Sequence, residues 1–320
     1  MSRKLILSIT IFVMIVVSLG IWLAMNPKPD AGEQEIKIAA KTSDYLGAPL
    51  LVIREMNLLQ KYMPNLKLTI VSTESSAVSN EAIVANQVDG TIMGITNFLV
   101  GTEKRIPYKI AAPVSYLQLT IQTNNPSIKK ITDISSDDKI AVSSYTGTNA
   151  FLLAAIAKKY FGNYRALDRN FVIMDSADAL IALINKSGIS LQFGDAAQRK
   201  RANEAGCHTI FEGIETKAIN LCVFSDEFHD KHKELYNAFM QSLNEAIQLI
   251  NNKDEQAIDV IAKHLVVDKE AILAQLETGD IGFSSDFHNI NFDEYIDIAL
   301  ELELISSVIS IQDIIFEYGD

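Results

Sequence analysis

Apolar and polar positions follow the periods of strands and helices by turns along most of the chain. Residues 35–40 (EIKIAA) and 66–73 (LKLTIVST) alternate as half-buried strands do, whereas residues 43–63 between them repeat their apolar positions at helical spacing. This alternation continues to about residue 226, and a helical pattern then runs almost to the end. One apolar stripe of this helical tail contains Leu235, Phe239, Leu243, Ile247 and Ile250. Strands that alternate with helices predict an α/β fold with mainly parallel sheets.

The strand–helix alternation falls into two series, which predicts two domains. The first series ends near residue 118 and the second occupies residues 122–216. The helices of the tail, 232–305, carry apolar stripes that need a sheet to cover. A chain of 320 residues is long enough for two medium-sized domains with their own cores.

The N-terminus carries a long uncharged segment. Arg3 and Lys4 precede residues 5–25, which contain no charged residue and are long enough to span a bilayer. The segment is predicted to be a transmembrane anchor or a signal peptide within residues 1–25, with the rest of the chain exported. Residues 26–34 (NPKPDAGEQ) are predicted to be a linker because they are polar and contain two prolines and a glycine.

Charge and composition exclude several classes of function. A net charge of −12 argues against a nucleic-acid partner, which requires clustered lysine and arginine. The two cysteines, Cys207 and Cys222, could form a disulfide after export or remain as buried thiols. No cysteine–histidine cluster and no nucleotide-binding motif is present, so we expect no metal, no cofactor and no catalytic residues.

The stretch SSYTGTNAFLLAAIAKKYF, residues 143–161, is typical of a polar turn that leads into a buried helix. Its first turn, at Gly147–Asn149, would present unpaired N–H groups and the positive end of the helix dipole to an anion or a polar group. The same pattern also fits an ordinary helix start with Thr146 or Thr148 as the cap.

Several segments resemble the exported solute-binding proteins of bacterial ABC importers. The segments are EAIVANQVDGTIMGITN (81–97), SIKKITDISSDDKIAVSSYTGTNAFLL (127–153), residues 237–265 and residues 292–305. The chain is most similar to the branch for nitrate, taurine, aliphatic sulfonates and pyrimidine precursors of thiamine. The segment ALINKSGISLQFGDAAQ, 182–198, departs from the family pattern and leaves the ligand class open.

The resemblance implies a two-lobed fold of the type II periplasmic binding proteins, with a ligand cleft between the lobes. Lobe one would comprise residues 35–118 and 222–320, and lobe two residues 122–216. The chain would cross between the lobes at 118–122 and 216–222. The family function implied is capture of a small organic solute, sulfonate-like, taurine-like or pyrimidine-like, by lobe closure. The implied setting is the periplasm or the outer face of the cytoplasmic membrane, where the protein would serve an ABC permease as a monomer.

In such a fold the ligand contacts loops at the carboxyl ends of strands, where helices begin. Tyr45, Tyr145 and Phe193 would stack on a planar ligand, whereas Tyr116 is interpreted as core or hinge packing. Asp44, Asp175 and Asp195 would accept from ligand amino groups, although such aspartates also cap helices. The predicted ligand-binding residues are Ser43, Asp44, Tyr45, Ser75, Ser76, Thr96, Asn97, Tyr145, Thr146, Gly147, Thr148, Asn149, Asp175, Phe193 and Asp195.

Two other functions fit the same fold. An uncleaved anchor and the altered 187–196 segment would suit a membrane-anchored sensor or partner protein that does not transport. A pyrimidine-processing enzyme would need a nucleophile or metal cluster, for which the sequence shows no motif.

Overall fold

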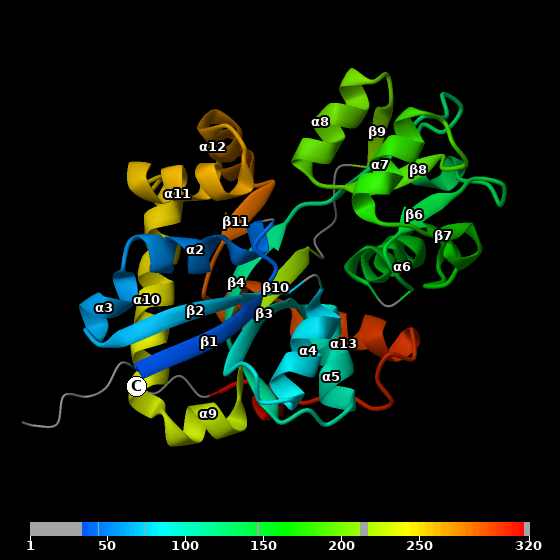
Figure 1. Ribbon diagram of the computed structural model, residues 1–320. Coiled ribbons are helices and arrows are strands. Elements are labelled where there is room, and N and C mark those ends of the chain that lie inside the picture. The colour runs from blue at the N-terminus through cyan, green and yellow to red at the C-terminus, as the bar shows by residue number, and fades with distance from the viewer. Residues whose placement is uncertain (1–33, 44, 74, 146, 212–216, 317–320) are drawn as a thin grey trace, which may run out of the picture.

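The computed structural model describes residues 34–43, 45–73, 75–145, 147–211 and 217–316. It consists of two α/β lobes, each built around its own sheet, as the sequence predicted (Figure 1). The predicted signal or anchor segment lies outside these ranges. Within them, no helix has both the length and the apolar character needed to cross a membrane.

The first sheet has six strands in the order β11-β4-β10-β3-β1-β2. In β1, Ile36 and Ile38 point to one face and Ala39 to the other, so both faces of this strand are buried. β1 pairs in parallel with β2 and β3, whereas β10 and β11 pair antiparallel with β4. The strands are β1 (Gln34–Ala40), β2 (Leu66–Ser72), β3 (Gly90–Gly94), β4 (Tyr108–Leu117), β10 (Ala218–Ser225) and β11 (Ile281–Phe283).

Helices cover both faces of this first sheet. One face packs on α2 (Ala48–Glu55), α3 (Leu58–Tyr62), α10 (Lys233–Asn251), α11 (Glu255–Leu265) and α12 (Lys269–Thr278). The other face packs on α4 (Ser76–Val84), α5 (Ile95–Glu103), α13 (Phe292–Glu301) and α14 (Ile311–Ile314). The short helix α9 (Asp226–Lys231) follows β10, and the 3-10 turns η1 (Tyr45–Gly47) and η4 (Phe287–Asn289) complete the lobe.

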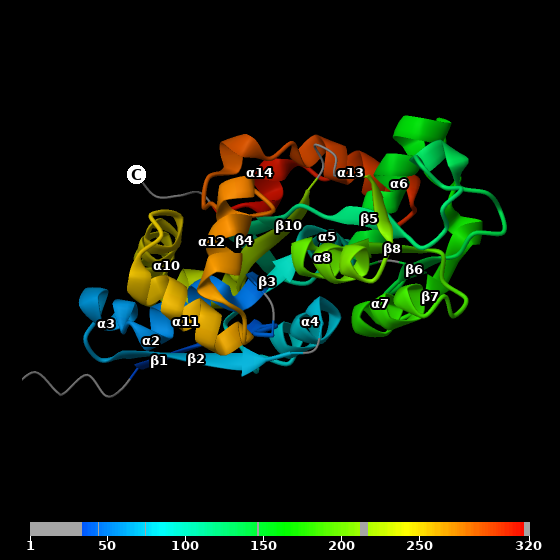
Figure 2. The ribbon, with the colours of Figure 1, turned by 90° about the horizontal axis from the view of Figure 1, so that it is seen from above.

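The second sheet has the order β7-β6-β8-β5-β9. Figure 2 shows α6 (Thr148–Phe161) on one side of this sheet and α7 (Ser176–Ile184) on the other, where α8 (Ala196–Glu204) joins α7. The strands are β5 (Thr120–Thr123), β6 (Ile140–Val142), β7 (Phe171–Ile173), β8 (Leu191–Gly194) and β9 (His208–Phe211), and the 3-10 turns are η2 (Ile131–Asp133) and η3 (Asp168–Asn170).

Both sheets are mixed, where the sequence predicted mainly parallel ones. β10 runs antiparallel to β3 and β4, and β5 runs antiparallel to β8 and β9. These are the strands next to the two passages between lobes, where the chain leaves one sheet and later returns to it. One strand leads the chain out of a sheet and another leads it back, so the two run in opposite directions. The local pattern of apolar residues does not encode the direction of a strand.

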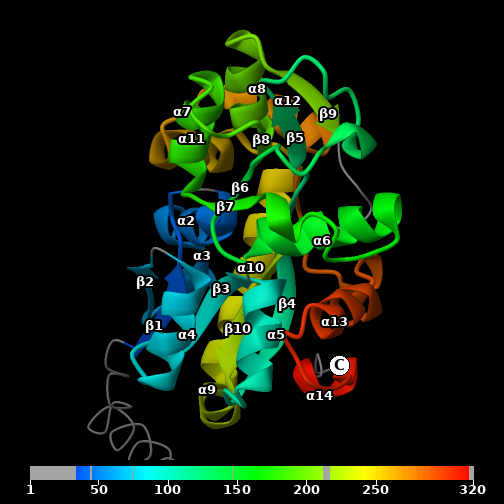
Figure 3. The same cartoon turned by 90° about the vertical axis from the view of Figure 1, so that its right-hand side faces the viewer.

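The helical tail covers the sheet of lobe one and contacts lobe two through α13. The apolar stripe of α10 is buried as predicted. Further along, α13 of lobe one packs against α6 of lobe two (Figure 3). The rings of Phe151 and Tyr295 stack there with their centroids 6.0 Å apart. A continuous core therefore links the lobes through the C-terminal segment.

Candidate functional site

The helix α6 begins without a side-chain cap. Its N-cap is Gly147, and no described side chain accepts a hydrogen bond from its first turn. Thr148 is the first helical residue and not the cap, and Thr146 lies outside the described residues. A Cβ atom at Gly147 would lie 2.9 Å from Ser144 Oγ, so glycine leaves room for the turn to fold tightly. The first N–H groups and the positive dipole end of α6 are therefore available to an anion or a polar group.

The other helices of lobe two begin differently, because aspartate caps them. Asp175 Oδ1 accepts from the Ala177 N–H at 2.9 Å at the start of α7. Asp195 Oδ1 accepts from the Gln198 N–H at 2.9 Å, and Gln198 Oε1 accepts from the Asp195 N–H at 3.2 Å, which forms a capping box for α8. The alternative that these aspartates are caps is confirmed.

The start of α6 meets the carboxyl end of β3 across the two lobes. A Cβ atom at Gly94, the last residue of β3, would lie 3.3 Å from Thr148 Oγ1 and 4.0 Å from Asn220 Oδ1. The Gly94 N–H donates to Ser76 Oγ at 3.4 Å, which brings the start of α4 to the same place. Strand ends and helix starts thus gather at the junction between the lobes, where open α/β sheets bind ligands.

Two polar side chains at this junction are buried. Thr96, in the first turn of α5, is fully buried and its Oγ1 has no hydrogen-bond partner among the described residues. Asn220 of β10 is 6% exposed and donates through Nδ2 to Ser115 Oγ of β4 at 3.0 Å. A buried hydroxyl without a hydrogen-bond partner destabilises the folded protein unless a ligand or a water molecule forms a hydrogen bond with it.

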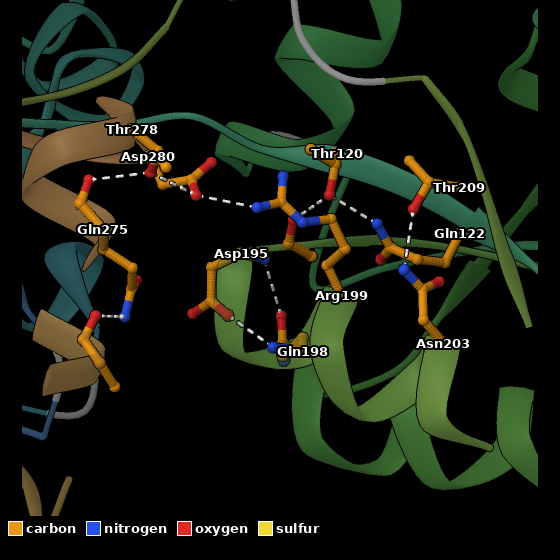
Figure 4. Close-up of polar contacts among 12 residues, drawn as sticks. Thr120, Gln122, Asp195, Gln198, Arg199, Asn203, Thr209, Gln275, Thr278 and Asp280 are labelled. Atoms are coloured by element: carbon orange, nitrogen blue, oxygen red, sulfur yellow. Dashed lines mark hydrogen bonds and ion pairs between the residues drawn. The ribbon is translucent and has the colours of Figure 1, made fainter. Parts of the chain in front are cut away.

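A polar network joins the lobes on the side of α8 and α12 (Figure 4). Arg199 Nη2 of α8 lies 2.8 Å from Asp280 Oδ2, which also accepts from Thr278 Oγ1 at 2.8 Å. Asp280 lies between α12 and β11 of lobe one. The side chains of Arg199 and Asp280 are 27% and 12% exposed, so this ion pair is partly shielded from solvent.

Tyr45 lies in the same region of lobe one. Its hydroxyl accepts from Gln275 Nε2 at 3.0 Å, and its ring belongs to the core of lobe one. Burial raises the pKa of Tyr45, the bond from Gln275 offsets part of that rise, and the charge of Asp195 adds to it.

The three aromatic rings that were predicted to stack on a ligand differ from that prediction in their exposure or their neighbours. Phe193 is 2% exposed within the apolar core that links the lobes, so its ring presents no exposed face on which a ligand could stack in this structure. The ring of Tyr45 is also buried, at 8% exposure, and cannot serve as a stacking platform. Tyr145 is 64% exposed and faces Phe171 of its own lobe at 6.3 Å between ring centroids.

The remaining predicted residues divide by location. One group lies at the starts of α4, α5 and α6, which meet at the junction. It comprises Ser76, Thr96, Gly147, Thr148 and Asn149. Ser43 and Ser75 are exposed, and Ser75 caps α4 by accepting from the Val78 N–H at 3.4 Å. The main-chain carbonyl of Asn97 accepts from Asn80 Nδ2 at 3.2 Å, and Asp44 lies outside the described residues.

The sequence reasoning missed the polar residues that surround the junction. Asn220 is a single amide within the apolar run AINLCVF, and this could have marked it as a buried polar group with a specific partner. Arg199 and Asp280 gave no signal, because they are distant in the chain and their neighbours are ordinary helix residues. Among the described residues, no group of histidine, cysteine, aspartate and glutamate side chains could hold a metal ion.

The fold, but not the sequence, has clear relatives. No protein-family model and no curated protein matches the chain. The aliphatic sulphonate-binding protein SsuA from Escherichia coli has a TM-score of 0.72 at 16% identity, covering 89% of this chain and 92% of that chain. SsuA from Xanthomonas axonopodis pv. citri, bound to MOPS, has a TM-score of 0.71 at 14% identity, covering 89% and 99%.

A nitrate-binding protein shares the same architecture. NrtA from Synechocystis PCC 6803 has a TM-score of 0.58 at 15% identity, covering 76% of this chain and 70% of that chain. At such low identities the likeness concerns the fold alone. The chain therefore has the two-lobed α/β fold of the periplasmic binding proteins, as its sequence resemblance predicted.

Proposed function

We propose that this chain is an extracytoplasmic solute-binding protein that captures a small organic solute between its lobes and delivers it to an ABC permease. The observation that carries the proposal is the uncapped start of α6, which lies against Gly94 of the other lobe. A polar ligand held there would contact both lobes, and this favours the closed arrangement over the open one.

The residues at the junction suit a ligand with two kinds of polar group. The N–H groups at Gly147–Asn149 would hold an oxyanion without any lysine or arginine, because the helix dipole supplies the positive field. The carboxylate of Asp195 would accept from an amino group, and the unpartnered hydroxyl of Thr96 would serve either. These features support a taurine-like or aminopyrimidine-like solute over a simple anion such as nitrate.

The passages between the sheets provide the hinge in this proposal. β4 ends at Leu117 and β5 begins at Thr120, so the outward crossing is short. We propose that lobe closure bends the chain here and that Arg199 and Asp280 pair as the lobes meet. Export and a monomeric state belong to the same proposal, with residues 5–25 as either an uncleaved anchor or a cleaved signal peptide.

A ligand screen tests this function. Purified full-length protein is melted with taurine, ethanesulfonate, nitrate and an aminopyrimidine, each in a separate titration. A ligand at a hundred times its Kd should stabilise the protein by roughly 2.7 kcal/mol. A rise in Tm with taurine or the aminopyrimidine supports the proposal and selects the ligand class. No rise with any of these ligands would count against it.

A further inference from the structure

A cavity lies beside the ends of β4 and β10 that adjoin the passages between the lobes. It has a volume of about 610 Å³ and is enclosed by β4, β10, β11, α13 and the segment between β11 and α13. The residues that decide its chemistry are Ser115, Tyr116, Lys217, Phe283, Glu294 and Tyr295, and none of its lining residues is a predicted ligand residue. Figure 2 shows α13 above β10 and β4, on the side away from β1 and β2. The volume is within the usual range for small-molecule pockets, roughly 300–1,000 Å³.

The walls of this cavity are held by specific contacts. Tyr295 is 3% exposed, and its hydroxyl donates to the Lys217 carbonyl at 2.7 Å and accepts from the Lys217 N–H at 3.1 Å. Tyr116 lies over Gly282, where any Cβ atom would overlap its ring. Ser115 accepts from Asn220, so its own hydroxyl hydrogen remains available as a donor. These contacts fix the positions of the polar groups before any ligand arrives.

The cavity contains both signs of charge. Lys217 Nζ lies 4.1 Å from the centroid of the Tyr116 ring, and it forms no ion pair with any described carboxylate. Glu294 of α13 and Asp286 line the same cavity from other elements. Phe283 and Ile219 add apolar side chains to the lining. A ligand that matches this lining needs an anionic group, a cationic group and an apolar body.

We propose that this cavity binds a small zwitterion with an apolar body, of the class of the apolar amino acids. Its carboxylate pairs with Lys217, its ammonium group pairs with Glu294, and its side chain packs on Phe283 and the tyrosine rings. The site touches Tyr116 at the end of β4 and Lys217 at the start of β10, on either side of the passages between lobes. This proposal does not rest on the solute function proposed above.

Three ligands with the same phenyl ring measure the contributions of the carboxylate and of the ammonium group separately. The full-length protein is titrated by calorimetry with L-phenylalanine, with 2-phenylethylamine, which lacks the carboxylate, and with 3-phenylpropanoate, which lacks the amine. Each ion pair at a partly exposed site is worth about fivefold in affinity. L-phenylalanine should therefore bind about fivefold more tightly than either analogue.

Two variants assign the charges to residues. Lys217→Met should weaken phenylalanine about fivefold and leave 2-phenylethylamine unchanged, whereas Glu294→Gln should weaken both amines and leave 3-phenylpropanoate unchanged. Lys158→Met is the matched control for the first, since Lys158 Nζ lies 4.9 Å over the ring of Tyr164 on the surface. Glu301→Gln, also on α13, is the control for the second. Circular dichroism verifies that each variant folds.

The outcomes decide the proposal whatever the solute screen gives. Absence of phenylalanine binding by the wild type, or wild-type affinity for phenylalanine in both cavity variants, overturns it. Thr148→Arg should leave phenylalanine binding intact, because Thr148 lies at the start of α6 and not in this cavity. Loss of phenylalanine binding in Thr148→Arg would place the amino acid at the junction between lobes and overturn the second site.

Discussion

At the scale of single residues, two glycines and two buried polar side chains shape the junction between the lobes. Gly94 and Gly147 keep side-chain volume away from the start of α6, which lets Thr148 approach the other lobe. Thr96 and Asn220 bring buried polar groups to the same place. Asp175 and Asp195 accept hydrogen bonds from N–H groups in the first turns of α7 and α8, whereas the first turn of α6 has no such cap.

The two cysteines provide a prediction at this scale. Both are free and buried, and burial raises the pKa of each thiol. Because a raised pKa leaves less thiolate at pH 8, neither should react with iodoacetamide in the folded protein, and both should react in denaturant. Mass spectrometry of the intact protein measures this. Modification of Cys222 in the native state would contradict the buried position of β10.

Sequence reasoning at the residue scale succeeded where the cause is local. The helix beginning near Thr148 follows from a glycine-containing turn before an apolar run, and the aspartate caps follow from their position before helices. The rings of Tyr45 and Phe193 were misplaced because polar neighbours suggested exposure. Their burial depends on which elements pack above them, and no local pattern carries that information.

At the scale of elements, the strength of the pattern decides what can be predicted. The nineteen-residue helix α10 repeats its apolar stripe over five turns and was predicted correctly. β11 has three residues, Ile281–Phe283, and was missed within the helical tail. It forms only because β4 offers a free edge, with which Gly282 pairs opposite Tyr116. A strand fixed by a distant partner has too few residues to show a period of its own.

The packing of α13 on the hinge gives a prediction for this scale. Tyr295→Phe keeps the stacking with Phe151 but removes the hydroxyl that bonds both the N–H and the carbonyl of Lys217. We expect the free energy of unfolding to fall by about 1–3 kcal/mol, because partly buried backbone groups lose a partner. Urea denaturation measures the change. Tyr160→Phe, on the half-exposed end of α6, is the control and should change stability by less than about 0.5 kcal/mol.

At the scale of the whole molecule, two lobes are joined on one side by a shared core and on the other by polar contacts. The α6–α13 contact is apolar and continuous, whereas Arg199 and Asp280 meet as a partly exposed ion pair. An apolar core holds its partners together, while an ion pair can separate into water at little cost. This asymmetry suits a molecule that opens on the side of α8 and α12.

The ion pair between Arg199 and Asp280 provides a test of whether the molecule opens on the side of α8 and α12. Asp280→Asn should weaken the closed arrangement and lower the affinity of a solute found in the screen by about threefold to fivefold. Glu277→Gln removes the Lys253–Glu277 pair within lobe one and should leave the affinity unchanged. Calorimetric titration of both variants measures the difference. Equal affinities in the two variants would mean that the Arg199–Asp280 pair plays no part in closure.

The central claim is that the solute binds where the start of α6 meets Gly94. The most direct test is a calorimetric titration of the wild-type protein and of Thr148→Arg with the ligand that raises Tm most, with Ser187→Arg as an exposed control in the same lobe. An arginine at the first position of α6 would fill the space beside Gly94. The account predicts one-to-one binding by the wild type and by Ser187→Arg, and a loss of at least about thirtyfold in Thr148→Arg. Unchanged affinity in a folded Thr148→Arg protein would contradict it.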